Sequence, residues 1–404
     1  MTHDPGRPAV TVGPEPATGR PKPAARLFYI DNLRIVLTAL VVLHHTAVTY
    51  GHIPAWYYTE PAKDGSGLAL DAFVMFNQAF FMGFFFMIAG YFTPSSYGRK
   101  GTRPFLRDRL KRLGIPLLAF ILLIRPLVNF SGYTALRAQL AEQGRDLPYW
   151  LYYGLSWDAG PMWFVEVLLV FSLVYALVRH RRARGLAGPG SEGAGVRAPE
   201  RAPRPLRPFA IVTFTLGLAL ATYLWRFVVP NGSYLPVLGL PTPSYLPQYA
   251  SFFVIGVLAH RHGWPQTLSR VAGRVGFAVA TVATLAYLPV VVTAGNGVLD
   301  GRGSWQSLAG AAWESTFAVG VVLGLTVLFR ERFHRQGPVA AFLSRHAFAV
   351  YLTHAAVLVG LGYAFRWLHT LAVVKFALVA VLALPLCWAV AYAVRRLPRA
   401  DRVL

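Results

Sequence analysis

The sequence predicts an all-α, polytopic membrane protein with about ten transmembrane helices and both termini in the cytoplasm. Of its 404 residues, 55% are hydrophobic and only 14% are charged, whereas about a quarter of the residues of soluble domains are charged. Apolar runs recur that can cross a hydrocarbon core of about 30 Å, which takes roughly 20 helical residues. Lys and Arg gather in alternate connections between these runs, as they do in multi-spanning proteins.

We expect ten spans, of which the sixth is short. They are centred on residues 31–50, 72–92, 112–130, 161–179, 209–229, 246–260, 272–293, 308–329, 346–365 and 371–394. With the N-terminus inside, the cytoplasmic connections hold 30 Lys and Arg residues and the outer connections hold five. Because positive residues accumulate on the cytoplasmic side, an even number of spans is favoured. We expect the protein in the cell (plasma or inner) membrane.

A single transmembrane domain is expected over residues 27–396. A disordered cytoplasmic tail, 1–26, precedes it and a short cytoplasmic tail, 397–404, follows it. The first tail is rich in proline and has no apolar run, so it lacks the apolar core of a cleavable signal peptide. The loop 180–208 is rich in Gly, Pro, Ala and Arg, which predicts a flexible cytoplasmic linker.

Several classes of function are excluded by composition and motifs. A net charge of +22 would suggest nucleic-acid binding in a soluble protein, but here the basic residues lie between apolar spans, so the expected partner is the lipid bilayer and not nucleic acid. The one cysteine, Cys387, excludes an internal disulfide and a cysteine-cluster metal site. There is no metal-spaced His cluster, no Gly-x-Ser-x-Gly motif and no P-loop, so we expect no metal, hydrolase or ATPase site.

The first span carries the ionisable residues on which the functional interpretation depends. Asp31 and Arg34 lie at its cytoplasmic end, and His44 and His45 lie toward the other. Ionisable side chains at membrane depth are costly and usually functional. Arg34 and His45 are close to three helical turns apart, which places them on one face, roughly 16 Å from each other. His44 points about 100° away and is predicted to be structural.

Two interpretations are open for each end of this span. His45 can exchange a proton near neutral pH, which suits the activation of a hydroxyl or amine, or it can simply bind a neighbouring helix. Asp31 and Arg34 are helical neighbours that can neutralise each other as an interfacial anchor. Arg34 could also bind phosphate or position a carbonyl.

A short amphipathic basic helix follows the second span and contains Arg103, Arg109 and Arg112. A face turned toward anionic lipid would explain it. The alternative is that this helix binds a polyanionic cytosolic cofactor, because Arg makes bidentate contacts to phosphate.

Glu166 is a carboxylate near the outer third of the fourth span, with Trp163 on the same helical face. A buried Glu in apolar surroundings is either protonated or paired, and His45 or Arg226 could be its partner. Glu314 is a similar but isolated case that we interpret as structural.

Tyr351 and His354 form another polar pair on one face of the ninth span. The outer loops at 131–160 and 229–245 are rich in aromatic residues and proline. Tyr and Trp suit the membrane interface, and they also suit stacking against sugar faces.

Five segments together resemble the integral-membrane acyltransferase 3 family, and within it the glucan-modifying, succinyltransferase-like branch. They are YIDNLRIVLTALVVLHH, FFFMIAGYFTPSSYGRKGTRPFLRDRLKRLGIPLL, PMWFVEVLLVF, YASFFVIGVLAHRHGW and SRHAFAVYLTHAAVL. The first matches the family's Arg and His separated by ten residues, here Arg34 and His45, and the second matches its Arg-x-x-Arg element, here Arg109 and Arg112. Many members carry Gly after the Arg of the first span, where this chain has Ile35, as expected for the glucan-modifying branch. A single position does not fix the branch, so the acceptor stays open.

The resemblance implies transfer of an acyl group from cytosolic acyl-CoA, such as acetyl-CoA or succinyl-CoA, to a hydroxyl or amine of an envelope carbohydrate or another acceptor. The basic helix with Arg103, Arg109 and Arg112, called the basic element below, would bind the donor. Arg34, with or without Asp31, would position the acyl group, and His45 would act as general base. Glu166 is expected to be a further catalytic residue. The polar and aromatic residues of the later spans would bind the acceptor: Trp163, Tyr351 and His354. Direct transfer and an acyl-His intermediate both remain open.

This mechanism requires a passage along the face of the first span, because the acyl arm of the donor must reach past Arg34 toward His45. The alternative function is that of a secondary transporter or exporter of an envelope precursor or an acyl-linked metabolite, since intramembrane Arg, His and Glu also suit proton-coupled exchange.

Overall fold

The computed structural model describes residues 26–53, 55–155, 158–186, 204–235, 239–294 and 303–404. Within these ranges the chain forms helices, and the only pairing of extended backbone is an isolated bridge between Leu235 and Leu240. The prediction of an all-α fold is therefore confirmed for the described residues. The helices are α1 (Phe28–Tyr50), α2 (Gly67–Lys100), α3 (Thr102–Arg109), α4 (Ile115–Ala119), α5 (Arg125–Val128), α6 (Phe130–Glu142), α7 (Tyr149–Leu155), α8 (Trp163–Leu186), α9 (Pro208–Trp225), α10 (Leu246–His262), α11 (Trp264–Thr267), α12 (Arg270–Ala294), α13 (Trp305–Arg332), α14 (Pro338–Ala364) and α15 (Ala372–Arg395).

Shorter helical segments join them. Two are π-helical, η1 (Leu110–Gly114) and η2 (Phe120–Ile124), and they interrupt the path from α3 to α5. Three are 3₁₀ turns: η3 (Gly160–Met162), η4 (Pro243–Tyr245) and η6 (Ala400–Arg402).

Eight helices of the described residues are long and apolar enough to cross a membrane, and nine if the bent pair Thr102–Val128 and Phe130–Glu142 forms one span. The chain is thus a membrane protein, while ten spans and two cytoplasmic termini remain predictions. The expected short sixth span is α10, which has 17 residues. At 1.5 Å per residue it extends only about 25 Å, less than the hydrocarbon thickness.

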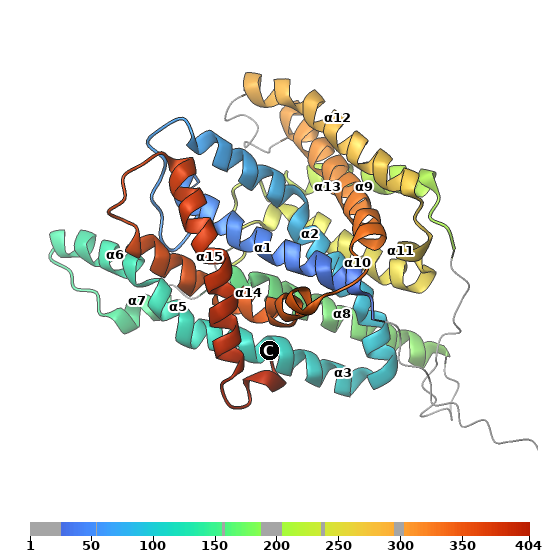
Figure 1. Cartoon of the computed structure of the whole chain (residues 1–404), viewed down its shortest axis with the longest axis horizontal. Helices are drawn as coiled ribbons and strands as arrows, with labels where there is room; N and C mark the ends of the chain where they lie inside the picture. The colour runs from blue at the N-terminus through green and yellow to red at the C-terminus, as the bar shows by residue number, and fades with distance from the viewer. Residues whose placement is uncertain (1–25, 54, 156–157, 187–203, 236–238, 295–302) are drawn as a thin grey trace, which may run out of the picture.

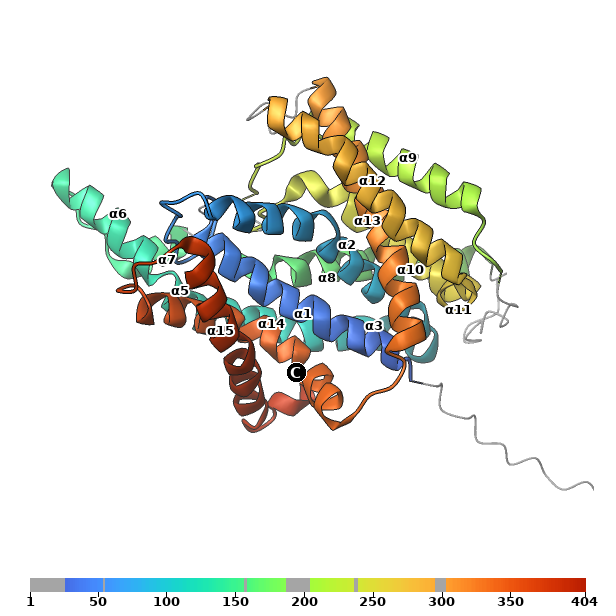
Figure 2. The same cartoon turned by 45° about the horizontal axis from the view of Figure 1, so that its top comes forward.

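Helix α1 lies in the middle of the bundle, where it packs against α2, α13, α14 and α15 (Figures 1 and 2). Its buried face includes Leu33, Leu37 and Val41, which recur every fourth residue as on one side of a helix. Helix α14 runs parallel to α1, because Asn32 contacts the segment before α14 and His45 contacts the middle of α14.

Helices α2 and α10 approach each other closely through two glycines. A Cβ atom at Gly90 would lie 2.1 Å from the carbonyl oxygen of Phe253, and one at Gly256 would lie 2.0 Å from that of Met87. Small residues allow membrane helices to pack with their backbones in contact. Gly90, in the segment GYF of the second span, and Gly256, in the segment FVIG of the sixth, therefore serve helix packing.

Helices α9, α12 and α13 form a group at one side of the bundle, in the upper right of Figures 1 and 2. A buried ion pair ties this group together: Arg226, 0% exposed at the end of α9, bonds Glu314 of α13. Tyr245 donates a hydrogen bond of 3.0 Å to the other Glu314 oxygen. The prediction that Glu314 is isolated is wrong, and so is the option that Arg226 pairs with Glu166, because helix packing joins Arg226 to Glu314.

The predicted linker 180–208 begins as helix. Helix α8 continues past His180 and ends at Leu186, since residues 180–184 contain no Pro or Gly and a single glycine, Gly185, is tolerated near the end of a helix. Residues 187–203 lie outside the described residues, as do residues 1–25 of the predicted N-terminal tail.

Candidate active site around His45

His45 lies in a cluster of stacked rings that three segments of the chain bring together. Its ring stacks on Trp56 at a centroid distance of 3.9 Å and an angle of 19°. On α14, His354 stacks on His45 at 5.2 Å and 26°. Trp56 comes from the connection 51–66, which folds back over the end of α1. The sequence analysis missed Trp56, although its place eleven residues after His45 in an aromatic loop was a weak signal.

The hydrogen bonds of His354 fix which nitrogen carries its proton. Its Nδ1 atom lies 2.8 Å from the carbonyl oxygen of Tyr351. A carbonyl only accepts, so Nδ1 donates and the neutral ring keeps its lone pair on Nε2. That Nε2 atom and Nδ1 of His45 are both buried without a hydrogen-bond partner among the described residues. Two imidazole nitrogens are thus left for a ligand or water.

His44 has a different environment. It is buried and stacks on Phe81 of α2 at 5.0 Å. The ring fills space between two helices, and the structural role of His44 stays a prediction.

Tyr351 connects the ring cluster to the start of α8. Its hydroxyl donates a hydrogen bond to the carbonyl oxygen of Pro161, two residues before Trp163. Trp163 is buried and stacks on Tyr249 of α10 at 5.3 Å. Of the three residues predicted to bind the acceptor, the structure brings Tyr351 and His354 to the ring cluster, whereas Trp163 packs between helices.

Glu166 lies one turn after Trp163, near the carboxylate of Asp158. Its Oε2 atom is buried and has no hydrogen-bond partner in the described ranges. The option of a Glu166–His45 ion pair is not realised among these residues.

Asp158 and Arg125 form a second polar centre that the sequence analysis did not single out. Arg125, 0% exposed, bonds Asp158 through Nε at 3.3 Å and through Nη2 at 3.0 Å. Asp158 also accepts the backbone N–H of Gly160 at 2.8 Å. An Arg inside an apolar span is itself a signal, so Arg125 could have been found by the reasoning that found Arg34.

Tyr57 lies beside this second centre. A Cβ atom at Gly160, where φ is +49°, would lie 1.9 Å from the Tyr57 hydroxyl oxygen, so only glycine fits there. Burial raises the pKa of Tyr57 above its ordinary value, and the charge of Asp158 adds to this effect. The phenol therefore stays protonated and able to donate.

The connection that carries Trp56 is held at both ends. His52 contacts Asp71 at 2.6 Å, and Glu60 pairs with the buried Lys375 at 2.5 Å. Asp64 accepts the backbone N–H of Ala372 at 3.0 Å and so satisfies an otherwise free donor at the start of α15. These contacts fix the position of Trp56 over His45.

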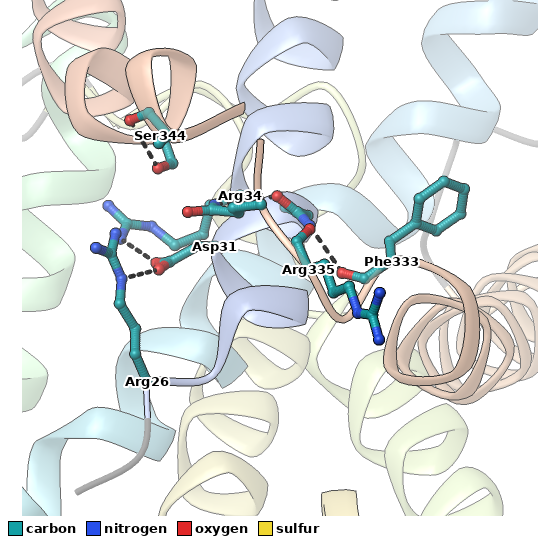
Figure 3. A network of polar contacts seen from close by, with 9 residues as sticks. Arg26, Asp31, Arg34, Phe333, Arg335 and Ser344 are labelled. Carbon is teal, nitrogen blue, oxygen red and sulfur yellow. Dashed lines mark hydrogen bonds and ion pairs between the residues drawn. The ribbon is translucent and has the colours of Figure 1, made fainter. Parts of the chain in front are cut away.

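The other end of α1 carries a network of ion pairs and hydrogen bonds, although the buried Tyr29 hydroxyl and Oε1 of Gln336 have no partner in the described ranges. Asp31 contacts Arg34 at 3.6 Å, as predicted, and also Arg26 at 2.8 Å. Figure 3 shows both arginines reaching Asp31, with Phe333 and Arg335 across the helix. Asn32 donates to the carbonyl oxygens of these two residues at 2.7 and 2.9 Å. Arg34 and His45 belong to one unbroken helix.

The basic element divides into two faces. Arg109 lies over the ring of the buried Phe105 at 5.3 Å, so it faces the bundle. Arg112 pairs with Asp108 at 3.1 Å, while Arg103 lines a hollow on the outer surface. The π-helical turn after Arg109 changes the number of residues per turn. The three predicted donor-binding residues therefore do not share one face.

A small apolar cavity of about 30 Å³ lies between α1, α2, α10 and α13, beside Tyr29 and Leu33. This volume corresponds to about one water molecule. Neither Arg34 nor His45 lines the cavity, so the passage along their face stays a prediction.

Comparison with known proteins gives one consistent result. A family model described as an acyltransferase domain matches residues 27–392. Glucans biosynthesis protein C of Salmonella schwarzengrund is 26% identical over 277 residues, which cover 66% of this chain and 66% of that protein. The proteins of the same name from Salmonella heidelberg and Escherichia coli are 25% and 26% identical over 285 and 281 residues. The chain thus spans just under two thirds of the first of these relatives. No solved structure matches it.

Proposed function

Because the chain belongs to the integral-membrane acyltransferase 3 family, we propose that it transfers an acyl group from cytosolic acyl-CoA to a hydroxyl, or an amine, of an envelope glycan or another acceptor. The observation that carries this proposal is the stack of His45 with Trp56 and His354. It joins a potential base to an aromatic surface. The name of the relatives, glucans biosynthesis protein C, supports a carbohydrate acceptor.

In this proposal His45 is the general base. As the acceptor oxygen attacks the thioester carbonyl, imidazole takes the hydroxyl proton, the carbon–sulfur bond breaks, and the imidazolium returns a proton to the departing CoA thiolate. An acyl-His intermediate is the variant in which His45 itself attacks first. Tyr57, protonated and unpartnered among described residues, is placed to donate a hydrogen bond to an acceptor.

Two further groups support the acceptor side of the site. The Nδ1–H of His354 donates to the carbonyl oxygen of Tyr351, so its Nε2 atom can accept a hydrogen bond from a second hydroxyl of the acceptor molecule. The indole of Trp56 presents an apolar face to a sugar ring, while Glu166 supplies a carboxyl group at the same end of the bundle. Trp163 would act by holding α8 in place.

The donor side of the proposal depends on arginines at the opposite end of α1. Arg109 faces the bundle and is the strongest candidate of the basic element for a donor phosphate, because Arg binds phosphate with two parallel hydrogen bonds. Arg34, with Asp31, would position the donor. Acetyl-CoA and succinyl-CoA are the first donors to test.

The test uses the purified full chain in lipid nanodiscs, acetyl-CoA or succinyl-CoA, and glucan oligosaccharides. Mass spectrometry of the oligosaccharide should show the added mass of one acyl group, and His45→Ala should slow its appearance at least about 10²-fold. The matched variant His44→Gln should retain transfer. Acylation at the wild-type rate in His45→Ala would contradict the catalytic assignment.

The same chain in sealed vesicles tests the transporter alternative. Movement of the oligosaccharide across the bilayer without a change in its mass would favour a transporter. In cells, mass spectrometry of envelope glycans with and without the protein should give one fixed mass difference that identifies the acyl group.

A further inference from the structure

A hollow on the outer surface of the basic element is separate from the candidate active site. It has a volume of about 530 Å³, and residues of α3, η1 and the start of α4 line it. Basic and apolar side chains alternate in its wall: Arg103, Leu106, Arg107, Leu110, Lys111 and Ile115. The hollow is shallow and open to the outside, so a ligand bound in it would stay largely outside the protein.

The three basic residues of the hollow differ from their neighbours in having no acidic partner. Lys100 and Arg112 share Asp108, at 2.8 and 3.1 Å. Arg103, Arg107 and Lys111 form no ion pair with any described residue, and all three are exposed. They follow one another at intervals of four residues, so they line one side of the helical path.

Exposed leucines follow the hollow along the next helical segments. Leu110, Leu118, Leu122 and Leu127 are 61%, 53%, 55% and 75% exposed. From Leu110 to Leu127 a helical path measures about 26 Å, close to the thickness of the hydrocarbon core. In a membrane protein an exposed leucine surface of this length faces lipid tails. The basic hollow then lies where lipid headgroups begin.

We propose that this hollow binds one anionic phospholipid, with the headgroup phosphate against Arg103, Arg107 and Lys111 and an acyl chain along Leu110 and Ile115. The charge of the three basic residues complements a phosphate, and the leucine surface complements a lipid tail. A soluble phosphate would leave that surface unused. A lipid bound here would contact the outer face of α3. The opposite face, which carries Phe105 and Arg109, would stay packed against the bundle.

The test measures lipid binding to the purified full chain by native mass spectrometry, with dioleoyl-phosphatidylglycerol and dioleoyl-phosphatidylcholine as probes. The wild type should bind the anionic lipid more tightly. Arg107→Gln with Lys111→Gln should weaken this binding roughly 25-fold, because each basic residue near an anionic headgroup contributes roughly fivefold. The matched control, Arg181→Gln with Arg184→Gln on α8, removes two exposed charges and should change it less than about twofold. Equal binding of the two lipids by the wild type would overturn the proposal.

A second variant examines the hollow independently of charge. Ile115→Trp fills the hollow from the lipid-facing side and keeps all three basic residues, so it should weaken binding of the anionic lipid while the charge stays constant. Unchanged binding in this variant would contradict a lipid seated in the hollow.

Competition distinguishes the sources of phosphate. Millimolar inorganic phosphate and acetyl-CoA should not displace phosphatidylglycerol. Displacement by either would assign the hollow to a soluble phosphate or to the acyl donor and overturn the proposal. None of these measurements requires catalysis, so the proposed acyl transfer can fail while lipid binding stands, and the reverse also holds.

Discussion

The two ends of α1 differ in how many of their buried polar groups lack partners. At the Arg34 end, Asp31 contacts Arg26 and Arg34, and Asn32 bonds two carbonyl oxygens of the segment before α14. Among the described residues, the Tyr29 hydroxyl and Oε1 of Gln336 are left without a hydrogen bond there. At the His45 end, buried polar atoms lack hydrogen-bond partners among the described residues. These atoms are Nδ1 of His44, Nδ1 of His45, Nε1 of Trp56, the Tyr57 hydroxyl, Oε2 of Glu166 and Nε2 of His354.

Under the proposed function, the His45 end is the reactive end and the Arg34 end is mainly structural. Most buried polar groups of folded proteins are hydrogen-bonded, and an unsatisfied group is costly unless water, a ligand or function accounts for it. The atoms near His45 come from α1, α8, α14 and the connection between α1 and α2, and under the proposed function a bound acceptor would pair with some of them. The fewer unpaired atoms at the Arg34 end agree with a role in holding the helix and positioning the donor.

The largest expected effect is at the reactive end. His45→Ala should lower kcat for acyl transfer about 10²- to 10⁴-fold, the usual contribution of a general base, with little change in thermal stability. Steady-state kinetics and a melting curve on the same preparation measure both quantities. A comparable loss of kcat in His44→Gln would mean that the two histidines have exchanged roles.

Trp56 should contribute to acceptor binding. Trp56→Ala removes the ring stacked on His45 and should raise the acceptor KM roughly 30-fold, about 2 kcal/mol, a loss typical of a truncated Trp at a binding surface. Trp56→Phe should recover most of the affinity, because it keeps an aromatic face. An unchanged KM in Trp56→Ala would remove Trp56 from the acceptor site.

Substitution of Asn32 examines the structural end. Asn32→Ala removes two hydrogen bonds to carbonyl oxygens and one from Gln336 at 3.0 Å, and should lower the free energy of unfolding by about 1 to 2 kcal/mol. Its kcat should stay within about twofold of wild type. If kcat falls while the melting temperature does not, the separation of the two ends is wrong.

The smallest effect on stability is expected for Arg34. Its side chain is 38% exposed and contacts Asp31 at 3.6 Å, and partly exposed ion pairs contribute at most about 1 kcal/mol. Arg34→Lys should therefore melt close to wild type but raise the donor KM, since Lys cannot make the planar bidentate contact of Arg. A donor KM unaffected by this variant would restrict Arg34 to anchoring α1.

The sequence by itself determined that the protein is an all-α membrane protein, and to which family it belongs, while the number of spans stays a prediction. Composition and apolar runs require membrane helices, because each span must satisfy its own backbone in lipid. Helical periodicity was enough to place Arg34 and His45 on one continuous helix, and to join Asp31 with Arg34, since these relations are local.

Only the tertiary structure decided which distant residues meet. It placed Trp56 and His354 on His45, joined Arg226 to Glu314 and Arg125 to Asp158, and turned Arg109 inward while Arg103 faces out. Such contacts depend on the packing of helices far apart in the sequence and on local departures from regular helix, such as the π-helical turn after Arg109. Neither is encoded in the periodicity of a single segment.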